Sequence, residues 1–86
     1  MFTCPVCGYD HLKERPRSEN GGSYEICPSC GFQFGVSDDD EHYTDEQWRN
    51  TWLRAGAHWA SAKRPPPGWE PLAQLERIGV HVKPRG

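Results

Sequence analysis

The sequence Cys4-Pro5-Val6-Cys7-Gly8-Tyr9 returns as Cys27-Pro28-Ser29-Cys30-Gly31-Phe32, so the chain carries the pattern Cys-Pro-x-Cys-Gly-aromatic twice. Nineteen residues separate Cys7 from Cys27. Two cysteines spaced by two residues direct both thiolates at one ion, and two such turns complete a tetrahedral set of sulfur ligands. The repeat therefore predicts one metal site whose ligands are Cys4, Cys7, Cys27 and Cys30.

Proline and glycine occupy matching positions in the two copies, which we call the first knuckle (residues 4–9) and the second knuckle (residues 27–32). A proline fixes φ at the start of each turn, and Gly8 and Gly31 follow the second cysteine, where the turn calls for positive φ. Four thiolates around one ion leave no position for a reacting water. We therefore expect one zinc ion, Zn²⁺, in a structural site.

Three other uses of the cysteines stay open. Iron held by four thiolates is the first, because both knuckles resemble those of rubredoxins, although rubredoxins place more residues between the pairs. A redox Cys-x-x-Cys pair is the second, but it would need a thiol of lowered pKa at a helix N-terminus. Disulfide bonds are the third, and they are rare in reducing compartments.

The composition favours a small core that needs a metal. Only 35% of the 86 residues are hydrophobic and the mean hydropathy is −0.87. Ordering the backbone costs roughly 1–2 kcal/mol per residue, so chains of this size commonly add a metal ion or disulfides. The sequence has neither a long apolar run nor a signal-peptide pattern, so we expect a cytoplasmic protein without a membrane partner.

Composition divides the chain into three segments that we expect to pack as one domain. Residues 1–36 form the predicted zinc-ribbon (Cys4) module, in which residues 20–22 close a β-hairpin and residues 23–26 form its returning strand. Residues 37–64 hold an acidic lead-in and an amphipathic helix. Residues 65–86 hold a proline-rich linker, a short helix and a tail. The predicted fold class is a small metal-stabilised α+β domain with an N-terminal zinc ribbon, or double zinc knuckle, a short β-hairpin and two helices.

The amphipathic helix is predicted over residues 45–62. Thr44 and Gln47 have the spacing of a capping box, which marks its first turn. An apolar stripe at helical spacing then runs along one face. This stripe consists of Trp48, Trp52, Ala55 and Trp59.

The short second helix is predicted to begin at Pro71, because proline suits the first helical position. Gly79 is its expected C-cap, and residues 80–86 are expected to fray. Its predicted apolar side consists of Leu72, Leu75 and Ile78.

Charge and tryptophan are both concentrated after the knuckles. Residues 37–46 carry six acids and no base, and residues 47–86 carry seven bases and two acids, within a chain of net charge −2. Four tryptophans are many for so small a core, so part of this surface is expected to bind a partner. The predicted partner-binding residues are Asp38, Asp39, Asp40, Glu41, Trp52, Trp59 and Trp69.

Each of these features also has a simpler interpretation. The acidic run lacks the glycine and the distal glutamate of a calcium loop, and a solvated lead-in to the helix explains it. The tryptophan stripe is more typical of a core than of a binding surface. Lys13, Arg15 and Arg17 could contact phosphate, but Glu14 and Glu19 dilute their charge, so a solvated loop is expected. No catalytic motif occurs, and no enzymatic activity is predicted.

Four stretches carry a family resemblance: CPVCGYDHL, SYEICPSCGFQFGVSDD, PPPGWEPLAQL and a helix of the form W-R-x-x-W-L-x-A-G-x-x-W. Across residues 3–76 the chain resembles the small bacterial cysteine-rich CPCC-type proteins, a family of uncharacterised function. The resemblance implies a zinc-ribbon-like fold with the four cysteines as ligands. It implies a sister group rather than the core family, because Val6 and Ser29 stand where extra cysteines could fall. Some small acidic relatives occur near toxin loci, which suggests an immunity protein.

We predict a non-enzymatic zinc-binding protein that acts through protein–protein interaction, in one version as an immunity-type or regulatory partner of a basic protein. The first alternative is a nucleic-acid-binding zinc ribbon that uses Lys13, Arg15, Arg17 and the basic C-terminal half. The second alternative is a rubredoxin-like electron-transfer protein that holds iron.

Overall fold

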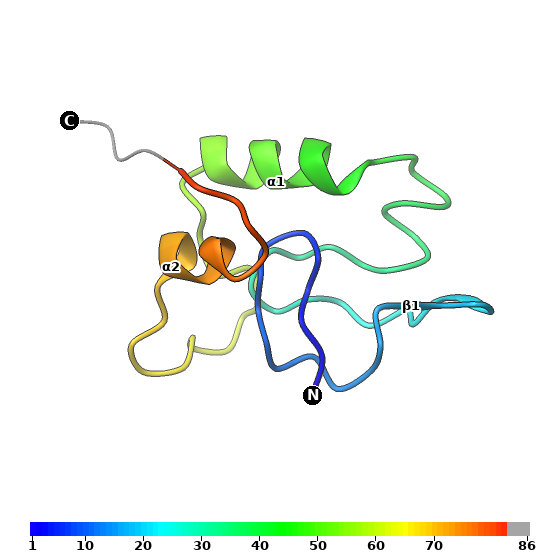
Figure 1. Cartoon of the computed structure of the whole chain (residues 1–86), viewed down its shortest axis with the longest axis horizontal. Coiled ribbons are helices and arrows are strands. Elements are labelled where there is room, and N and C mark those ends of the chain that lie inside the picture. Colours follow the sequence, from blue (N-terminus) through cyan, green and yellow to red (C-terminus); the bar gives the residue numbers. More distant parts are fainter. Residues whose placement is uncertain (83–86) are drawn as a thin grey trace.

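The structure is a computed structural model that describes residues 1–82, with the two knuckles between the helices and the hairpin (Figure 1). The hairpin projects from one end of the molecule and α2 lies toward the other. A small α+β fold with one antiparallel hairpin and two helices is thereby confirmed. The elements are β1 (Arg17–Ser18), β2 (Gly21–Gly22), α1 (Asp45–Arg54) and α2 (Pro71–Glu76).

Each knuckle is closed by an antiparallel bridge between residues that flank it. Phe2 pairs with Leu12 around the first knuckle, and Ile26 pairs with Gln33 around the second. The repeat in the sequence is therefore a repeat in the backbone. Each knuckle is therefore a closed loop by itself, and the two loops then pack against each other at the cysteines.

The hairpin between the knuckles has a different turn from the predicted one. Because Ser18 pairs with Gly21, the turn is residues 19–20 and both glycines belong to β2. Gly21 has a φ of +99°, and a Cβ on Gly22 would lie 2.3 Å from the backbone nitrogen of Gly35. Gly21 allows the positive φ, and Gly22 allows the backbone of Gly35 to approach closely. The prediction that residues 23–26 form the returning strand was wrong.

Helix α1 begins where the sequence predicts. The Thr44 side chain accepts a hydrogen bond from the Gln47 N–H, and the Gln47 side chain accepts one from the Thr44 N–H, both at 3.0 Å. This capping box satisfies two donors at the helix end that have no partner within the helix. The predicted start of the helix is confirmed.

Helix α1 ends at Arg54, so the prediction that it extends to residue 62 was wrong. Gly56 has a φ of +106°, and its N–H donates to the carbonyl of Leu53. The next N–H, that of Ala57, donates back to the carbonyl of Trp52 at 2.8 Å. These two bonds form a Schellman motif, in which a glycine of positive φ stops the helix. The glycine outweighs the tryptophan spacing that suggested a longer helix.

Helix α2 begins at Pro71 as predicted, and Gly79 closes its last turn with a φ of +76°. Its apolar side differs from the predicted one: Leu75 is fully buried, but Leu72 is 40% exposed. Gln74 takes the buried position instead, with 3% of its surface exposed. Of the predicted fraying tail, residues 83–86 lie outside the described residues.

The core is centred on the knuckles. Phe32 and Phe34 are fully buried, with ring centroids 5.1 Å apart. Only three of the buried hydrophobic residues among residues 1–82 come from beyond residue 36, namely Trp52, Ala57 and Leu75. Within residues 1–82, no helix combines the length and the apolar character that crossing a bilayer requires.

We expect Thr44→Ala to destabilise the metal-loaded chain by about 1 kcal/mol, because it removes the side-chain acceptor of the capping box. Thr44→Ser keeps this acceptor and is the matched control, so its unfolding midpoint should stay close to that of the parent chain. Urea unfolding followed by tryptophan fluorescence measures both variants. If the alanine and serine variants unfolded at the same urea concentration, the capping box would not stabilise α1.

Candidate metal centre

The four cysteine sulfurs meet at one buried point. All four Sγ atoms lie within 4.8 Å of one another. Cys4 Sγ lies 3.9 Å from Cys30 Sγ, and Cys7 Sγ lies 3.7 Å from Cys27 Sγ. A tetrahedron with metal–sulfur bonds of about 2.3 Å has edges of about 3.8 Å, so the four thiols fit one tetrahedral ion. This geometry suits zinc and iron alike.

The knuckle backbones hold the cysteines in place. In the first knuckle the Cys4 N–H donates to the Tyr9 carbonyl at 2.7 Å, and the Gly8 N–H donates to the Cys4 carbonyl at 2.8 Å. The equivalent bonds of the second knuckle measure 2.9 and 2.8 Å. Gly8 and Gly31 have φ values of +86° and +81°, as their place in the repeat predicts. A residue with a Cβ would be strained at either position.

The thiols perturb one another strongly. Hydrogen bonding with Cys27 lowers the pKa of Cys7 far below its usual range. Hydrogen bonding with Cys27 also raises the pKa of Cys30 far above its usual range, and burial adds to this shift. Close contact therefore favours the thiolate form of Cys7 over that of Cys30. A divalent cation would favour further thiolates, because its charge offsets theirs.

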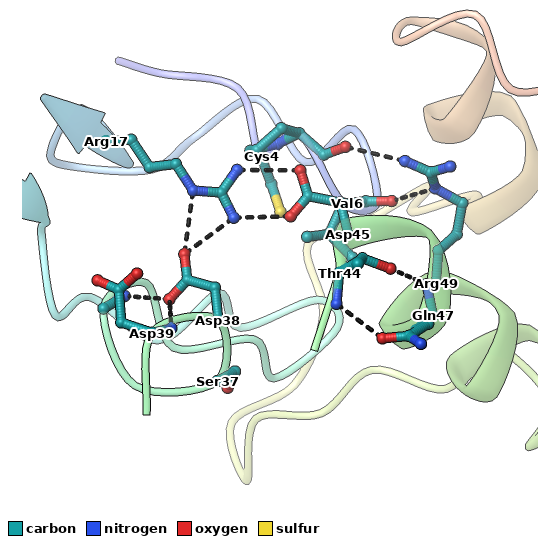
Figure 2. A network of polar contacts seen from close by, with 12 residues as sticks. Cys4, Val6, Arg17, Ser37, Asp38, Asp39, Thr44, Asp45, Gln47 and Arg49 are labelled. Carbon is teal, nitrogen blue, oxygen red and sulfur yellow. Dashed lines mark hydrogen bonds and ion pairs between the residues drawn. The ribbon is translucent and has the colours of Figure 1, made fainter. Parts of the chain in front are cut away.

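Helix α1 reaches back to both knuckles. Arg49 donates from Nε to the carbonyl of Val6 at 2.7 Å and from Nη2 to the carbonyl of Pro5 at 3.1 Å. The indole N–H of Trp48 donates to the carbonyl of Cys30 at 2.9 Å. Figure 2 shows the Arg49 guanidinium facing the first knuckle. Sequence reasoning missed Arg49, because its acceptors are backbone atoms more than forty positions away.

The irregular chain after α1 covers the second knuckle. The Ala60 N–H is shared between the carbonyls of Pro28 and Ser29, at 3.0 and 3.1 Å. The Ser61 N–H donates to the carbonyl of Pro28 at 2.9 Å. If α1 continued to residue 62, these N–H groups would bond within the helix, so the early end of α1 leaves them free to bond the knuckle.

Gln74 joins the two knuckles to α2. Its Nε2 donates to the carbonyl of Cys7 at 3.1 Å and to the hydroxyl of Ser29 at 2.9 Å. Its Oε1 accepts from the indole N–H of Trp69 at 3.1 Å. The buried amide therefore has partners for both its nitrogen and its oxygen, as a buried polar group needs. Nothing in the spacing of α2 marked this residue in the sequence.

These contacts share one pattern: seven carbonyls inside the knuckles accept hydrogen bonds from donors beyond residue 47. Hydrogen bonds around metal ligands fix their orientation and support metal affinity. The C-terminal half therefore forms the outer layer of the cysteine site. The accepting carbonyls are those of Pro5, Val6, Cys7, Gly8, Pro28, Ser29 and Cys30.

A second polar network ties the hairpin to the start of α1. Arg17 donates two hydrogen bonds to the carboxylate of Asp45, at 2.9 and 2.7 Å, and one to Asp38 at 3.0 Å. Its guanidinium also lies 5.7 Å from the ring centroid of Phe32 and 5.6 Å from that of Phe34. Figure 2 shows Arg17 between the two carboxylates. Arg17 is exposed, as a solvated residue is expected to be, but it lies in β1 and is paired with two carboxylates, which the sequence did not predict.

The Asp38 carboxylate accepts hydrogen bonds from neighbouring backbone N–H groups, whereas Asp39, Asp40 and Glu41 are exposed. It accepts hydrogen bonds from the N–H groups of Gly35 at 2.7 Å and Asp39 at 2.9 Å. Burial raises the pKa of Asp38, but the Gly35 bond and the Arg17 ion pair outweigh burial and hold that pKa below its usual value. Asp38 is therefore committed to the turn before α1.

The other predicted partner-binding residues fall into three groups. Asp39, Asp40 and Glu41 are exposed. Trp52 is only 7% exposed, belongs to the core, and donates its indole N–H to the carbonyl of His58. The remaining pair is half-buried and in contact, with ring centroids 5.2 Å apart. This pair is Trp59 and Trp69.

Comparison with known proteins finds uncharacterised relatives in Bacillus subtilis (strain 168). The chain is 31% identical to the uncharacterised protein YoaQ over 70 residues, and this alignment covers 64% of the chain and 59% of YoaQ. The chain is 36% identical to the uncharacterised protein YozI over 44 residues, and this alignment covers 48% of the chain and 36% of YozI. The chain thus spans less than two thirds of the length of either relative.

No protein-family model matches the chain, and no solved structure matches it. The resemblance to the CPCC-type proteins therefore stays a prediction. The comparisons add relatives whose names state no activity.

We expect Gly8→Ala to destabilise the chain more than Gly31→Ala, although both glycines have similar positive φ. A Cβ on Gly8 would lie 2.1 Å from the backbone oxygen of Gln74, so α2 would have to move. A Cβ on Gly31 would meet side-chain atoms alone, namely the Cβ of Ala60 at 3.3 Å and Cζ2 of Trp48 at 4.0 Å. The backbone strain common to both costs roughly 1–2 kcal/mol. Melting temperatures of the metal-loaded variants test this, and equal values would contradict the seating of α2 on the first knuckle.

Removing the metal is expected to unfold α1 and α2 together with the knuckles, because the helices bond to knuckle carbonyls whose positions depend on the cysteines. Chelation under reducing conditions should abolish the helical circular dichroism signal. It should also abolish the protection of the helix amides from hydrogen exchange. Adding zinc back should restore both. Helices that kept slow amide exchange after complete metal removal would show that the C-terminal half folds independently.

Proposed function

We propose that this chain is a non-enzymatic, zinc-ribbon-like protein of the cytoplasm that binds one structural zinc ion and acts through protein–protein interaction. The observation that carries the metal assignment is the buried set of four thiols within 4.8 Å of one another. Their carbonyl neighbours are already bonded to the C-terminal half. This support suits an ion that holds the fold together.

A structural role follows from the chemistry of the ligands. Four thiolates fill the tetrahedral shell of zinc and leave no position for a reacting water or substrate. Cys4, Cys7 and Cys27 have no exposed surface and Cys30 has 4%, so the thiols are poorly placed for redox exchange with another molecule. Zinc is proposed over iron because a structural site needs no redox chemistry.

The proposed contact region is the exposed acidic turn before α1. Asp39, Asp40 and Glu41 make no ion pair among residues 1–82 and project charge at one place. Charge of one sign steers a partner of opposite sign, which suits an immunity-type or regulatory partner of a basic protein. Asp38 and Trp52 are left out of this region, because both are engaged within the fold.

One of the cations that the nucleic-acid alternative would use, Arg17, is already paired within the chain. Arg17 is held by two carboxylates of the same chain, so its charge is already neutralised. Nucleic-acid affinity depends on cations that remain free to replace the counterions of phosphate. A net charge of −2 further weakens this alternative.

The test is capture of partners from the native cell by the zinc-loaded chain. We expect the purified protein to hold about one zinc per chain and to have no visible colour. We also expect the chain to capture a protein that the triple variant Asp39→Asn, Asp40→Asn, Glu41→Gln does not capture. The matched control removes three acids elsewhere, with Glu19→Gln, Glu70→Gln and Glu76→Gln. A red, iron-containing protein would refute the zinc assignment. Specific capture of nucleic acid, with a steep salt dependence, would refute the protein-partner proposal.

A further inference from the structure

A groove of about 770 Å³ opens beside the metal centre, among three stretches of chain. They are residues 9–14 after the first knuckle, residues 23–28 before the second, and residues 59–66 after α1. The volume lies within the range of roughly 300–1,000 Å³ that is usual for binding sites. No thiol lines the groove, so the metal site does not account for it.

The groove has exposed apolar side chains on a fixed backbone. Tyr24 is 66% exposed and Ile26 is 57% exposed. Tyr24 has a φ of +66°, which is an outlier for a bulky residue. Its N–H donates to the carbonyl of Phe34 at 2.9 Å, and its carbonyl accepts from the side chain of Gln33 at 3.1 Å. The fold therefore holds an aromatic ring in solvent at the cost of backbone strain, a combination associated with binding sites.

A buried donor without a partner lies in the same wall. The indole N–H of Trp59 is buried and has no hydrogen-bond partner within residues 1–82. Leaving such a group unpaired is unfavourable, and native proteins do so rarely. A carbonyl or carboxylate that reached it after a small rotation of the ring would relieve this cost.

The rim of the groove is basic although the chain as a whole is acidic. Lys13, Lys63 and Arg64 line the groove, and none of them forms an ion pair among the described residues. The lining also holds two acids, Glu14 and Glu25. The Glu25 carboxylate keeps its charge while it accepts the backbone N–H groups of Lys13 and Glu14, both at 3.0 Å. Three cations against two carboxylates leave a small positive excess, and the adjacent pair Lys63 and Arg64 favours an acidic occupant on that side of the groove.

We propose that this groove binds an extended acidic segment of a partner protein. An apolar side chain of the segment packs among Tyr24, Ile26 and Trp59, and its carboxylates face Lys63 and Arg64. The inference rests on the proposed function, since it assumes that the chain acts by binding a protein. It adds a second surface, of opposite charge to the acidic turn at residues 39–41.

A protein segment fits the groove better than a single-stranded nucleic acid does. Both neighbours of the Trp59 ring are aromatic: Tyr9 and Trp69 stand edge-on to it, at 5.6 and 5.2 Å between centroids. Tyr24 and His11 are then the exposed rings of the lining on which a base could stack. Strand binding combines several stacked bases with a continuous run of cations, and three cations interrupted by two acids make a short run.

The experiment selects ligands from a phage-displayed library of random eight-residue peptides on the zinc-loaded chain. We expect the selected peptides to be enriched in Asp or Glu together with Leu, Phe, Trp or Pro. Nuclear magnetic resonance should locate the strongest peptide by shifts at Tyr24, Ile26 and the Trp59 indole. An oligothymidine strand of eight nucleotides serves as the competing probe and should cause no such shifts.

Charge variants then test the rim. The double variant Lys63→Glu, Arg64→Glu should weaken the selected peptide at least about fivefold at low salt. Arg54→Glu, on the exposed side of α1, also reverses a cation but lies outside the groove and should leave affinity unchanged. Tyr24→Asn replaces the ring with a residue that tolerates positive φ, so it should keep the melting temperature and weaken the peptide.

Several outcomes would overturn the groove assignment. These are a basic consensus, a library without binders, shifts outside the groove, equal weakening by Arg54→Glu, or binding of the oligothymidine in the groove. The proposed function has a separate test, because the acidic-turn variant leaves the groove intact. Loss of cellular capture in that variant, with no peptide binding in the groove, would uphold the proposed function and refute this inference.

Discussion

The convergence of four thiols at one buried point is the constraint on which the rest of this fold depends. Two short turns of the same design bring the sulfurs together, and their carbonyls face outward as a ring of acceptors. Beyond residue 47, Trp48, Arg49 and Gln74 dock by donating to that ring. Trp52, Ala57 and Leu75 add the apolar contacts of the core. A chain with only 35% hydrophobic residues thus replaces a large apolar core with a shared polar layer around a metal site.

The features that sequence predicts correctly are those with local causes. The spacing of the cysteines, Gly8 and Gly31 in the knuckles and the capping box at Thr44 each act within a few residues, and each has the predicted geometry. The end of α1 also has a local signal, Gly56, but the tryptophan spacing predicted a helix that continues to residue 62.

Other features had no local signal at all. Gln74 is buried because a knuckle carbonyl and a serine hydroxyl, far away in sequence, meet its amide. Arg17 is ion-paired because Asp38 and Asp45 come near it only after folding. Such pairings depend on how the segments dock, which periodicity and capping signals do not encode. Sequence analysis therefore identified the four cysteines that meet but not the residues that support them.

The bridges that close each knuckle separately have a consequence for engineering. Because Phe2–Leu12 and Ile26–Gln33 complete the two loops on their own, the metal centre does not depend on the length of the hairpin tip between them. That tip, residues 19–20, is exposed and projects from one end of the molecule (Figure 1). A fluorophore or an inserted peptide tag at this place would sit away from the thiols, so the protein can be labelled or immobilised there with its fold intact.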